Sequence, residues 1–228
     1  MNQKLLFKAL AIISAFSGVI ILTSVFYSIA SYEGVSRQKY PNLVSPVVEV
    51  KGSKLGEADF TRASNWFVGG ANSDNFVSSR VSFYLLSIPK LKIKDATVAV
   101  GGEDLSKNLI QYPGTALPGK RGNTIIFGHS ILPQFYDPED YLAIFSTLPT
   151  LDKGDLIEIN YDGISYRYEV ENMFEVLPTD IQVLEQNSSD SFLTLVTCVP
   201  PGHPLKPRRL IVRARIVPLG QANADIGN

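Results

Sequence analysis

The chain has 228 residues, of which 45% are hydrophobic and 19% are charged, and its formal net charge is −1. This length accommodates one large domain or two small ones, and the balanced charge gives no indication of nucleic-acid binding. Glycine and proline are somewhat abundant, with 17 and 14 residues, which is typical of a body rich in β-strands and loops.

The N-terminal segment is predicted to be a membrane anchor. Residues 9–32 carry no charge, and a helix of that length crosses about 30 Å of hydrocarbon. Lys4 and Lys8 precede the segment and Glu33 follows it, so the positive-inside rule places the body of the chain outside the cytoplasm. A signal peptide cleaved after Ala30 is the alternative, although the apolar region of such a peptide is typically only about 7–15 residues.

The body of the chain is predicted to be all-β. Residues 33–81 read as a juxtamembrane region in which the patch at 66–68, Trp-Phe-Val, favours some packing on the following domain. Beyond residue 81, short β-branched and aromatic runs alternate with turn signals, which is typical of a closed or nearly closed β-barrel. The expected strands are 83–88, 91–93, 96–100, 124–128, 156–161, 164–176, 192–197 and 210–217, with short helices at 105–112 and 141–148.

The single cysteine, Cys198, follows the strand predicted at 192–197. Exported proteins usually pair their cysteines, so a lone thiol outside the cytoplasm is either intermolecular or reactive. Arg208 and Arg209 open the next strand, and pairing of the two strands would place a cation beside the thiol. Arginine favours the thiolate and offers donors to a developing oxyanion. The alternative is that Cys198 is a small buried apolar side chain.

The chain has two histidines, in different surroundings. His129 ends an apolar strand just after a glycine, where it can project into a groove, whereas His203 lies in the proline-rich loop after Cys198. Cysteine with histidine is the minimal set for nucleophilic acyl transfer. One cysteine and two histidines at these spacings form no zinc-binding set, and we expect neither a metal nor another cofactor.

Four motifs in register resemble those of the bacterial sortases. The resemblance covers about residues 82–218 and implies an eight-stranded sortase-type β-barrel with a few short helices, preceded by the transmembrane helix. The motifs are TLVTC at 194–198, similar to the family's TLxTC; RLIV at 209–212, similar to R-L-x-V; IFGHS at 126–130, which holds the strand-end histidine; and IFSTL at 144–148 followed by KGD at 153–155.

The resemblance implies a cysteine transpeptidase that cleaves an LPxTG-like sorting signal through a thioester. Cys198 would be the nucleophile and His129 the general acid for the departing amine. Arg209 would donate to the oxyanion or to the substrate backbone, with Arg208 as the adjacent alternative, and Thr197 would help to line the substrate site. The implied partners are surface proteins with a C-terminal sorting signal, an amine acceptor from a cell-wall precursor or a pilin lysine, and the membrane.

Other sequence features bear on the sortase subclass and on the competing functions. No Asp-Pro precedes residue 82, so the lid motif of class C is absent, and the proline-rich loop at 199–207 is closer to class D or E. A papain-type protease starts a helix with its cysteine, and an L,D-transpeptidase has a His-Gly-Cys-type motif; neither feature is present. A catalytically reduced, sortase-like peptide-binding module is the alternative function. The expected division is 1–8 cytoplasmic, 9–32 anchor, 33–81 juxtamembrane, 82–218 catalytic and 219–228 flexible tail.

Overall fold

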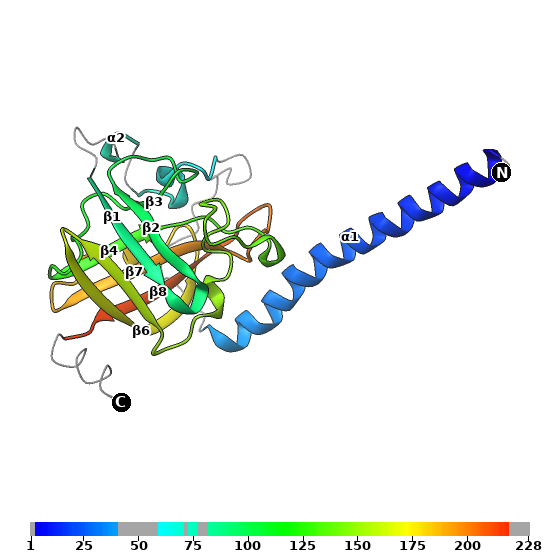
Figure 1. Ribbon diagram of the computed structural model, residues 1–228. Helices are drawn as coiled ribbons and strands as arrows, with labels where there is room; N and C mark the ends of the chain where they lie inside the picture. Colours follow the sequence, from blue (N-terminus) through cyan, green and yellow to red (C-terminus); the bar gives the residue numbers. More distant parts are fainter. Residues whose placement is uncertain (1–2, 41–58, 71–72, 77–81, 219–228) are drawn as a thin grey trace, which may run out of the picture.

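The computed structural model describes residues 3–40, 59–70, 73–76 and 82–218, which form a β-barrel and a long N-terminal helix (Figure 1). The helix α1 spans Gln3–Lys39, beyond the apolar segment expected at 9–32, and Phe7–Lys39 is apolar and long enough to cross a membrane. The chain from 59 onward adds two short helical elements before the barrel, η2 (Ala63–Trp66) and α2 (Ser73–Phe76).

Eight strands close into a barrel, which confirms the predicted fold. Their order around the barrel is β1-β2-β3-β4-β7-β8-β6-β5. Neighbouring strands are antiparallel except for the pairs β2–β3 and β4–β7, which are parallel. The strands are β1 (Ser82–Ile88), β2 (Ile93–Val100), β3 (Leu109–Gln111), β4 (Gly122–Phe127), β5 (Leu156–Tyr161), β6 (Ile164–Val176), β7 (Ser191–Val199) and β8 (Arg208–Ile216).

Some of the expected elements were wrong. The strands expected at 91–93 and 96–100 are one strand, β2, after a 3-10 turn, η3 (Pro89–Leu91). The helix expected at 105–112 is replaced by turns and the strand β3, because pairing with β2 and β4 buries all three of its residues. The helix expected at 141–148 is a run of turns that ends in η5 (Leu148–Thr150). The other 3-10 elements are η4 (Pro133–Phe135) and η6 (Ile181–Leu184).

β7 is the strand around which the core is built. All nine of its residues are buried, which accounts for a sequence that is mainly apolar and carries no charge. Leu193, Leu195 and Val199 pack in the cluster inside the barrel. Val196 and Cys198 face the opposite way, into a second cluster that includes aromatic side chains from 60–76. Cys198 therefore belongs to a layer that lies between the barrel wall and the preceding segment.

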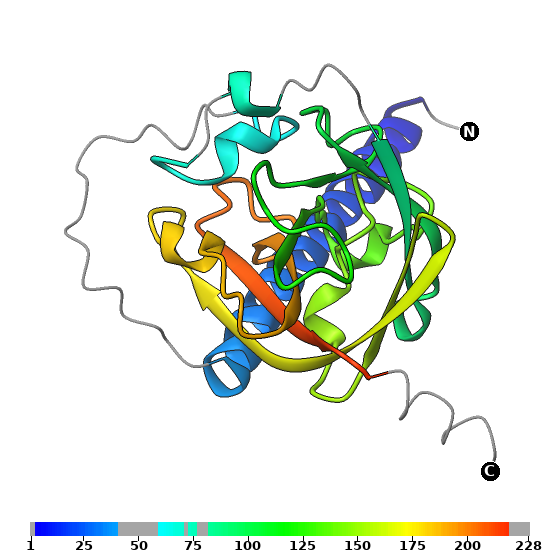
Figure 2. The same ribbon diagram turned by 90° about the vertical axis from the view of Figure 1, so that its left-hand side faces the viewer.

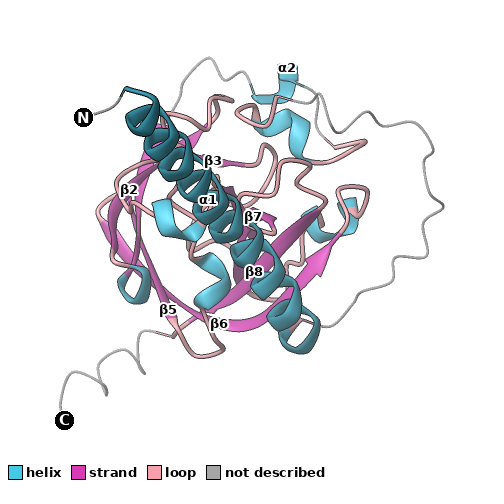
Figure 3. Cartoon of the chain, turned by 90° about the vertical axis from the view of Figure 1, so that its right-hand side faces the viewer, coloured by secondary structure: helices cyan, strands magenta, loops and turns pink. Residues whose placement is uncertain are grey.

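The C-terminal half of α1 lies along the barrel. Its partly or fully buried positions include Val25, Ser28, Tyr32 and Ser36, which recur every three or four residues as on one face of a helix, and Tyr40 just after the helix is also buried. Figure 3 shows α1 crossing in front of the barrel when viewed from the side toward which the helix projects. The N-terminal half is exposed and projects away from the barrel (Figure 1).

A buried carboxylate joins this helix to the barrel. Glu175 on β6 accepts hydrogen bonds at 2.6 Å from both the Tyr32 and the Ser36 hydroxyls. The same carboxylate pairs with Arg208 Nε at 2.9 Å, and Arg208 also binds Glu33 of α1. These contacts satisfy a charge that would otherwise be costly to bury, so they hold α1 against β6 and β8.

Candidate active site

Cys198 and Arg209 are directly opposite each other in the ladder between β7 and β8. The prediction that these strands are neighbours is confirmed, and a guanidinium does lie beside the thiol. Cys198 is the next-to-last residue of β7, and only 1% of its surface is exposed. The other neighbour of β7 is β4, whose last residue Phe127 pairs with Val196.

His129 is positioned by hydrogen bonds to β7 that continue past the end of β4. The Gly128 amide donates to the Val196 carbonyl at 3.2 Å, and the Thr197 hydroxyl donates to the Gly128 carbonyl at 2.8 Å. On the other side of His129, the Ser130 hydroxyl donates to the Cys198 carbonyl at 2.6 Å. Both neighbours of the histidine are thus tied to the end of β7 that carries Cys198.

Gly128 is required where β4 ends. A Cβ atom at this position would lie 2.4 Å from the Phe145 ring and 2.6 Å from the Leu109 side chain, so both would have to move. Phe145 also donates its backbone amide to the carbonyl of His129 at 2.9 Å. The glycine before the histidine therefore allows the close packing that fixes the direction of the chain at His129.

Arg209 is fully buried although it is charged. Its Nε donates to the Trp66 carbonyl at 3.0 Å, and its Nη1 donates to the Lys206 carbonyl at 2.8 Å. Burial lowers the pKa of Arg209, and the adjacent Cys198 acts in the opposite direction. The guanidinium is thus held by two backbone carbonyls, one from the chain before the barrel and one from the loop between β7 and β8.

Residues 59–70, which we call the cover segment, lie over these three side chains. Figure 2 shows η2 and α2 on the same side of the barrel as the loop after β7. The Trp66 ring stacks on Phe127 at a centroid distance of 5.1 Å and lies 5.7 Å from the ring of His129. Trp66 Nε1 donates to the Phe60 carbonyl at 2.9 Å, and the Phe60 ring lies 5.3 Å from the Arg209 guanidinium.

The cover segment was only partly foreseen from the sequence. The absence of Asp-Pro before residue 82 led us to expect no lid of the class C kind, yet a segment of different sequence covers the site. Packing of the Trp66-Phe67-Val68 patch on the domain, expected from its composition, is confirmed, since Trp66 and Phe67 are buried in the second core cluster. Nothing in the sequence pointed to Phe60 or to Lys206, whose ammonium lies 4.9 Å from the Phe60 ring.

The electrostatics of the covered site keep His129 neutral. The pKa of His129 is lowered to about 4, mainly by burial and secondly by the positive charge of Lys206, while Asp59 and Asp104 oppose these effects. Within the described residues, His129 Nε2 and Arg209 Nη2 are buried without a hydrogen-bond partner. Buried polar groups are normally paired, so these two atoms stand out as unused hydrogen-bonding groups beside Cys198.

The remaining candidate residues have other surroundings. Arg208 and Arg209 point to opposite faces as expected from strand alternation, but Arg208 binds Glu175 and Glu33 and is not directed into solvent alone. His203 is half-buried in the loop after β7, where its Nδ1 accepts the Leu205 amide at 3.1 Å. The buried Thr197 hydroxyl bonds to β4, so in this structure it joins the two strands; its predicted part in the substrate site stays a prediction.

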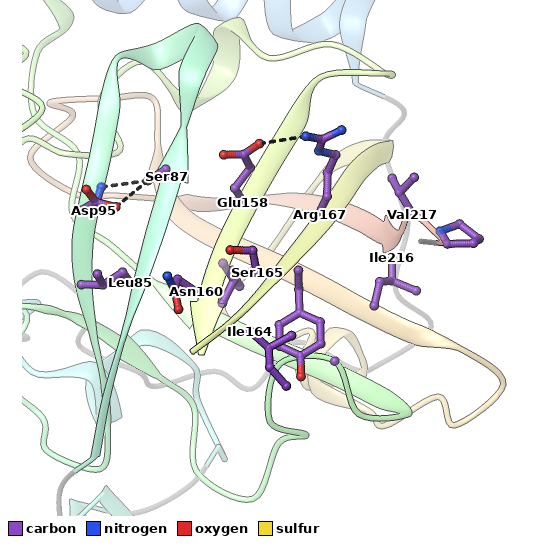
Figure 4. Close-up of a pocket in the computed structure, with 14 residues that line it drawn as sticks. Leu85, Ser87, Asp95, Glu158, Asn160, Ile164, Ser165, Arg167, Ile216 and Val217 are labelled. Carbon is purple, nitrogen blue, oxygen red and sulfur yellow. Dashed lines mark hydrogen bonds and ion pairs between the residues drawn. The ribbon is translucent and has the colours of Figure 1, made fainter. Parts of the chain in front are cut away.

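A separate pocket of about 620 Å³ lies elsewhere on the barrel. Figure 4 shows its lining, which comes mainly from β1, β5, the start of β6 and the end of β8, with Asp95 of β2 and Gly119 at its edge. Tyr168 on β6 pairs with Ile216, whereas Val176 at the other end of β6 pairs with Arg209. The pocket is therefore at the end of the β6–β8 ladder remote from Cys198, and it contains none of the three candidate catalytic residues.

The barrel with this arrangement of cysteine, histidine and arginine matches one known family. The family model described as "Sortase domain" matches residues 86–217, which is more than half of the chain. The chain belongs to the sortase family. The prediction of a cysteine transpeptidase is thereby confirmed at the level of the family, and Cys198 is the only cysteine available to it.

Relatives of this sortase come from several organisms. It is 23% identical to Sortase A of Bacillus anthracis over 210 residues, which span 87% of this chain and 90% of the relative. It is 31% identical to Sortase A of Staphylococcus aureus over 128 residues, which span 49% and 58% of the two chains. Among solved structures, a Clostridium perfringens Sortase D5 transpeptidase is 28% identical at a TM-score of 0.51, covering 60% of this chain and 79% of that one.

A lid mutant of Sortase A from Corynebacterium diphtheriae is similar to a comparable extent. It is 28% identical at a TM-score of 0.54, with coverage of 64% of this chain and 76% of that one. These neighbours include proteins named as class A and class D sortases, so the similarity establishes the family and the fold and leaves the subclass undetermined.

Proposed function

We propose that this protein is a membrane-anchored sortase that cleaves an LPxTG-like sorting signal and joins the released protein to a cell-surface amine. The observation that carries the proposal is the position of Cys198 on β7, between the strand that leads to His129 and the strand that carries Arg209 as its second residue. Three side-chain types needed for acyl transfer to and from a thiol thus meet on neighbouring strands.

The chemistry follows from the roles that these side chains can take. The Cys198 thiol passes its proton to His129 as its sulfur attacks the carbonyl carbon of the Thr–Gly-type bond, and Arg209 Nη2 donates to the oxygen that becomes negative. As the tetrahedral intermediate collapses, the C–N bond breaks and the departing amine takes a proton from His129. This leaves a thioester on Cys198. The acceptor amine then attacks the thioester, gives up a proton to His129, and releases the new amide and the thiolate.

The cover segment has to move before this reaction can begin. Cys198 is almost completely buried beneath Trp66 and its neighbours, so a peptide cannot reach the sulfur in the arrangement described. The low pKa of His129 has the same origin, since burial is its largest cause. Displacement of the cover by a substrate would return water or substrate dipoles to His129 and raise its pKa toward values suited to general acid catalysis.

Membrane anchoring is the second part of the proposal. The apolar part of α1 is long enough to span a bilayer, and Lys4 and Lys8 precede it. By the positive-inside rule the barrel would then lie outside the cytoplasm. There the enzyme would meet surface proteins with a sorting signal and an amine acceptor such as a cell-wall precursor or a pilin lysine.

Mass spectrometry of the full chain incubated with a panel of LPxTG-like peptides tests the proposal. We expect an adduct whose mass equals the peptide up to its threonine, minus one water, and its release by an added amine. Cys198→Ala removes the nucleophile and should give no adduct, whereas His203→Ala should give the adduct as the unchanged chain does. Peptide binding without an adduct in the unchanged chain would favour the alternative, a sortase-like peptide-binding module.

A further inference from the structure

The contacts of α1 fix the level at which the barrel lies along this helix. Ser28 donates to the side chain of Gln134 at 2.9 Å, and Gln134 in turn donates to the Ser24 hydroxyl at 3.4 Å. Among the described hydrogen bonds between the side chains of α1 and the barrel, these lie nearest to the N-terminus of α1; the others begin at Tyr32. The turn η4, which contains Gln134, is therefore the part of the barrel bonded to α1 at the level of Ser24 and Ser28.

That level coincides with the edge of a bilayer spanned by α1. A transmembrane helix needs about 20 residues at about 1.5 Å each. Counted from Lys8, the last charged residue before the apolar segment, such a span ends near Ser28. Tyr27 and Phe26 are 74% and 70% exposed there, and aromatic side chains are typical of the membrane–water interface. Gln134 is thus bonded to α1 where the helix leaves the hydrocarbon.

Two loops leave the barrel at this same end. The loop 130–136 follows β4 and His129, and the loop 200–207 follows β7 and Cys198. Figure 1 shows both loops, green and orange, on the side of the barrel toward which α1 projects. Each loop presents one large apolar side chain to the surroundings, Phe135 at 63% exposure and Leu205 at 59%.

We propose that these two loops contact the lipid headgroup region of the membrane in which α1 is anchored, with Phe135 and Leu205 as their apolar contacts. The inference rests on the membrane anchoring proposed above. It places the catalytic end of the barrel toward the bilayer and the pocket of Figure 4 away from it. Exposed Asp137 and Glu139 follow η4 directly, so the contact is confined to the interface and does not extend into the hydrocarbon.

The opposite end of the barrel offers matched controls. Phe83 is 56% exposed and Ile164 is 53% exposed, so both resemble Phe135 and Leu205 in size and exposure. Ile164 begins β6, at the end remote from Arg209, and Phe83 lies near the start of β1, two residues before Leu85, which pairs with Asn160 of β5. If exposure alone drew apolar side chains to lipid, these two would bind it equally well.

Fluorescence quenching in vesicles tests the inference. The full chain carrying Cys198→Ala receives one new cysteine, Phe135→Cys, Leu205→Cys, Phe83→Cys or Ile164→Cys, and a nitrobenzoxadiazole label. Phe16→Cys, in the exposed part of α1, reports on anchoring itself. Each labelled chain is reconstituted into phosphatidylcholine–phosphatidylglycerol vesicles with or without lipids that carry a nitroxide near the headgroup, and circular dichroism checks that the barrel is folded.

The expected result is a loss of fluorescence at Phe16, Phe135 and Leu205 and none at Phe83 and Ile164. Quenching at Phe16 with Phe135 and Leu205 at the level of the two controls would overturn the inference and leave the anchoring intact. Quenching at only one of the two loops would also overturn it, since both are required to face the bilayer. Absence of quenching at Phe16 would overturn the anchoring, and the inference with it, while leaving the proposed transpeptidation to its own test.

Discussion

Replacing Trp66 with alanine should uncover Cys198. The Trp66 side chain is fully buried, stacks on Phe127 and donates a hydrogen bond to the Phe60 carbonyl. Truncation of a buried tryptophan typically costs about 3–5 kcal/mol. The backbone carbonyl that binds Arg209 is retained, so the loss comes from the ring alone.

The size of the effect follows from how that loss is distributed. If the whole loss destabilises the docked position of the cover segment, the ratio of open to covered molecules rises by about two to three and a half powers of ten, at tenfold per 1.4 kcal/mol. The rate at which a small methanethiosulfonate reagent modifies Cys198 should rise accordingly, up to the rate of an uncovered thiol. Trp66→Phe keeps a ring for stacking and should give a smaller increase.

Two controls separate uncovering from unfolding. Ile164→Ala, at an exposed site that begins β6 at the end remote from Arg209, should leave the modification rate unchanged, and thermal unfolding followed by circular dichroism should show that the barrel of Trp66→Ala persists. A Trp66→Ala protein with a folded barrel and an unchanged modification rate would refute the argument that the cover segment controls access to Cys198.

Three further predictions concern the side chains proposed to be catalytic. His129→Ala should lower transpeptidation by about 10²–10⁴-fold, the usual contribution of general acid–base catalysis, and His203→Ala should not; equal losses in a peptide-cleavage assay would contradict the assignment. Arg209→Lys should cost about 10²–10³-fold, as for loss of an oxyanion donor, while Arg208→Lys keeps near-normal peptide turnover; the reverse order would move the role to Arg208. Finally, the pKa of His129 is about 4 in the covered state and about 6.5 when unperturbed. Between these pH values the unfolded chain binds a proton at His129 that the folded chain does not. The free energy of unfolding should therefore fall as pH drops from about 6.5 to 4. In urea titrations His129→Gln should lack that part of the fall, and an identical pH dependence would count against the burial argument.

Much of the barrel could be predicted because its strands carry local signals. Alternation and β-branched composition located β1, β4, β5, β6, β7 and β8 to within a few residues. The strand β3 was missed because it has only three residues, and its pairing with β2 and β4 is decided by tertiary contacts. The sequence also suggested a break at residues 94 and 95. The chain instead turns at Pro89–Leu91 and then continues as one strand from Ile93 to Val100.

The site could be predicted where chemistry is tied to strand ends, and not where it depends on packing. Cys198, His129 and Arg209 were identified by residue type and motif, and the register between β7 and β8 confirms that the cysteine and arginine are paired. The cover over them depends on how the aromatic patch at Trp66 and Phe67, far upstream of all three in the sequence, packs. A Trp66-Phe67 pair in a polar region signals burial somewhere, but its partner surface is a property of the folded barrel.

The position of β8 in the barrel has a consequence for biosynthesis. β8 is the last strand to be made, and it is inserted between β6 and β7, which have no other contact along that edge. A chain made N-terminus first therefore cannot close its sheet until residues 208–216 have emerged, and until then β6 and β7 present open edges, which are prone to aggregation. Because Arg209 belongs to that strand, the thiol acquires its cationic neighbour only when the barrel closes. A chain terminated before residue 208 would retain the cysteine and histidine but lack both the closing strand and the arginine proposed to assist catalysis.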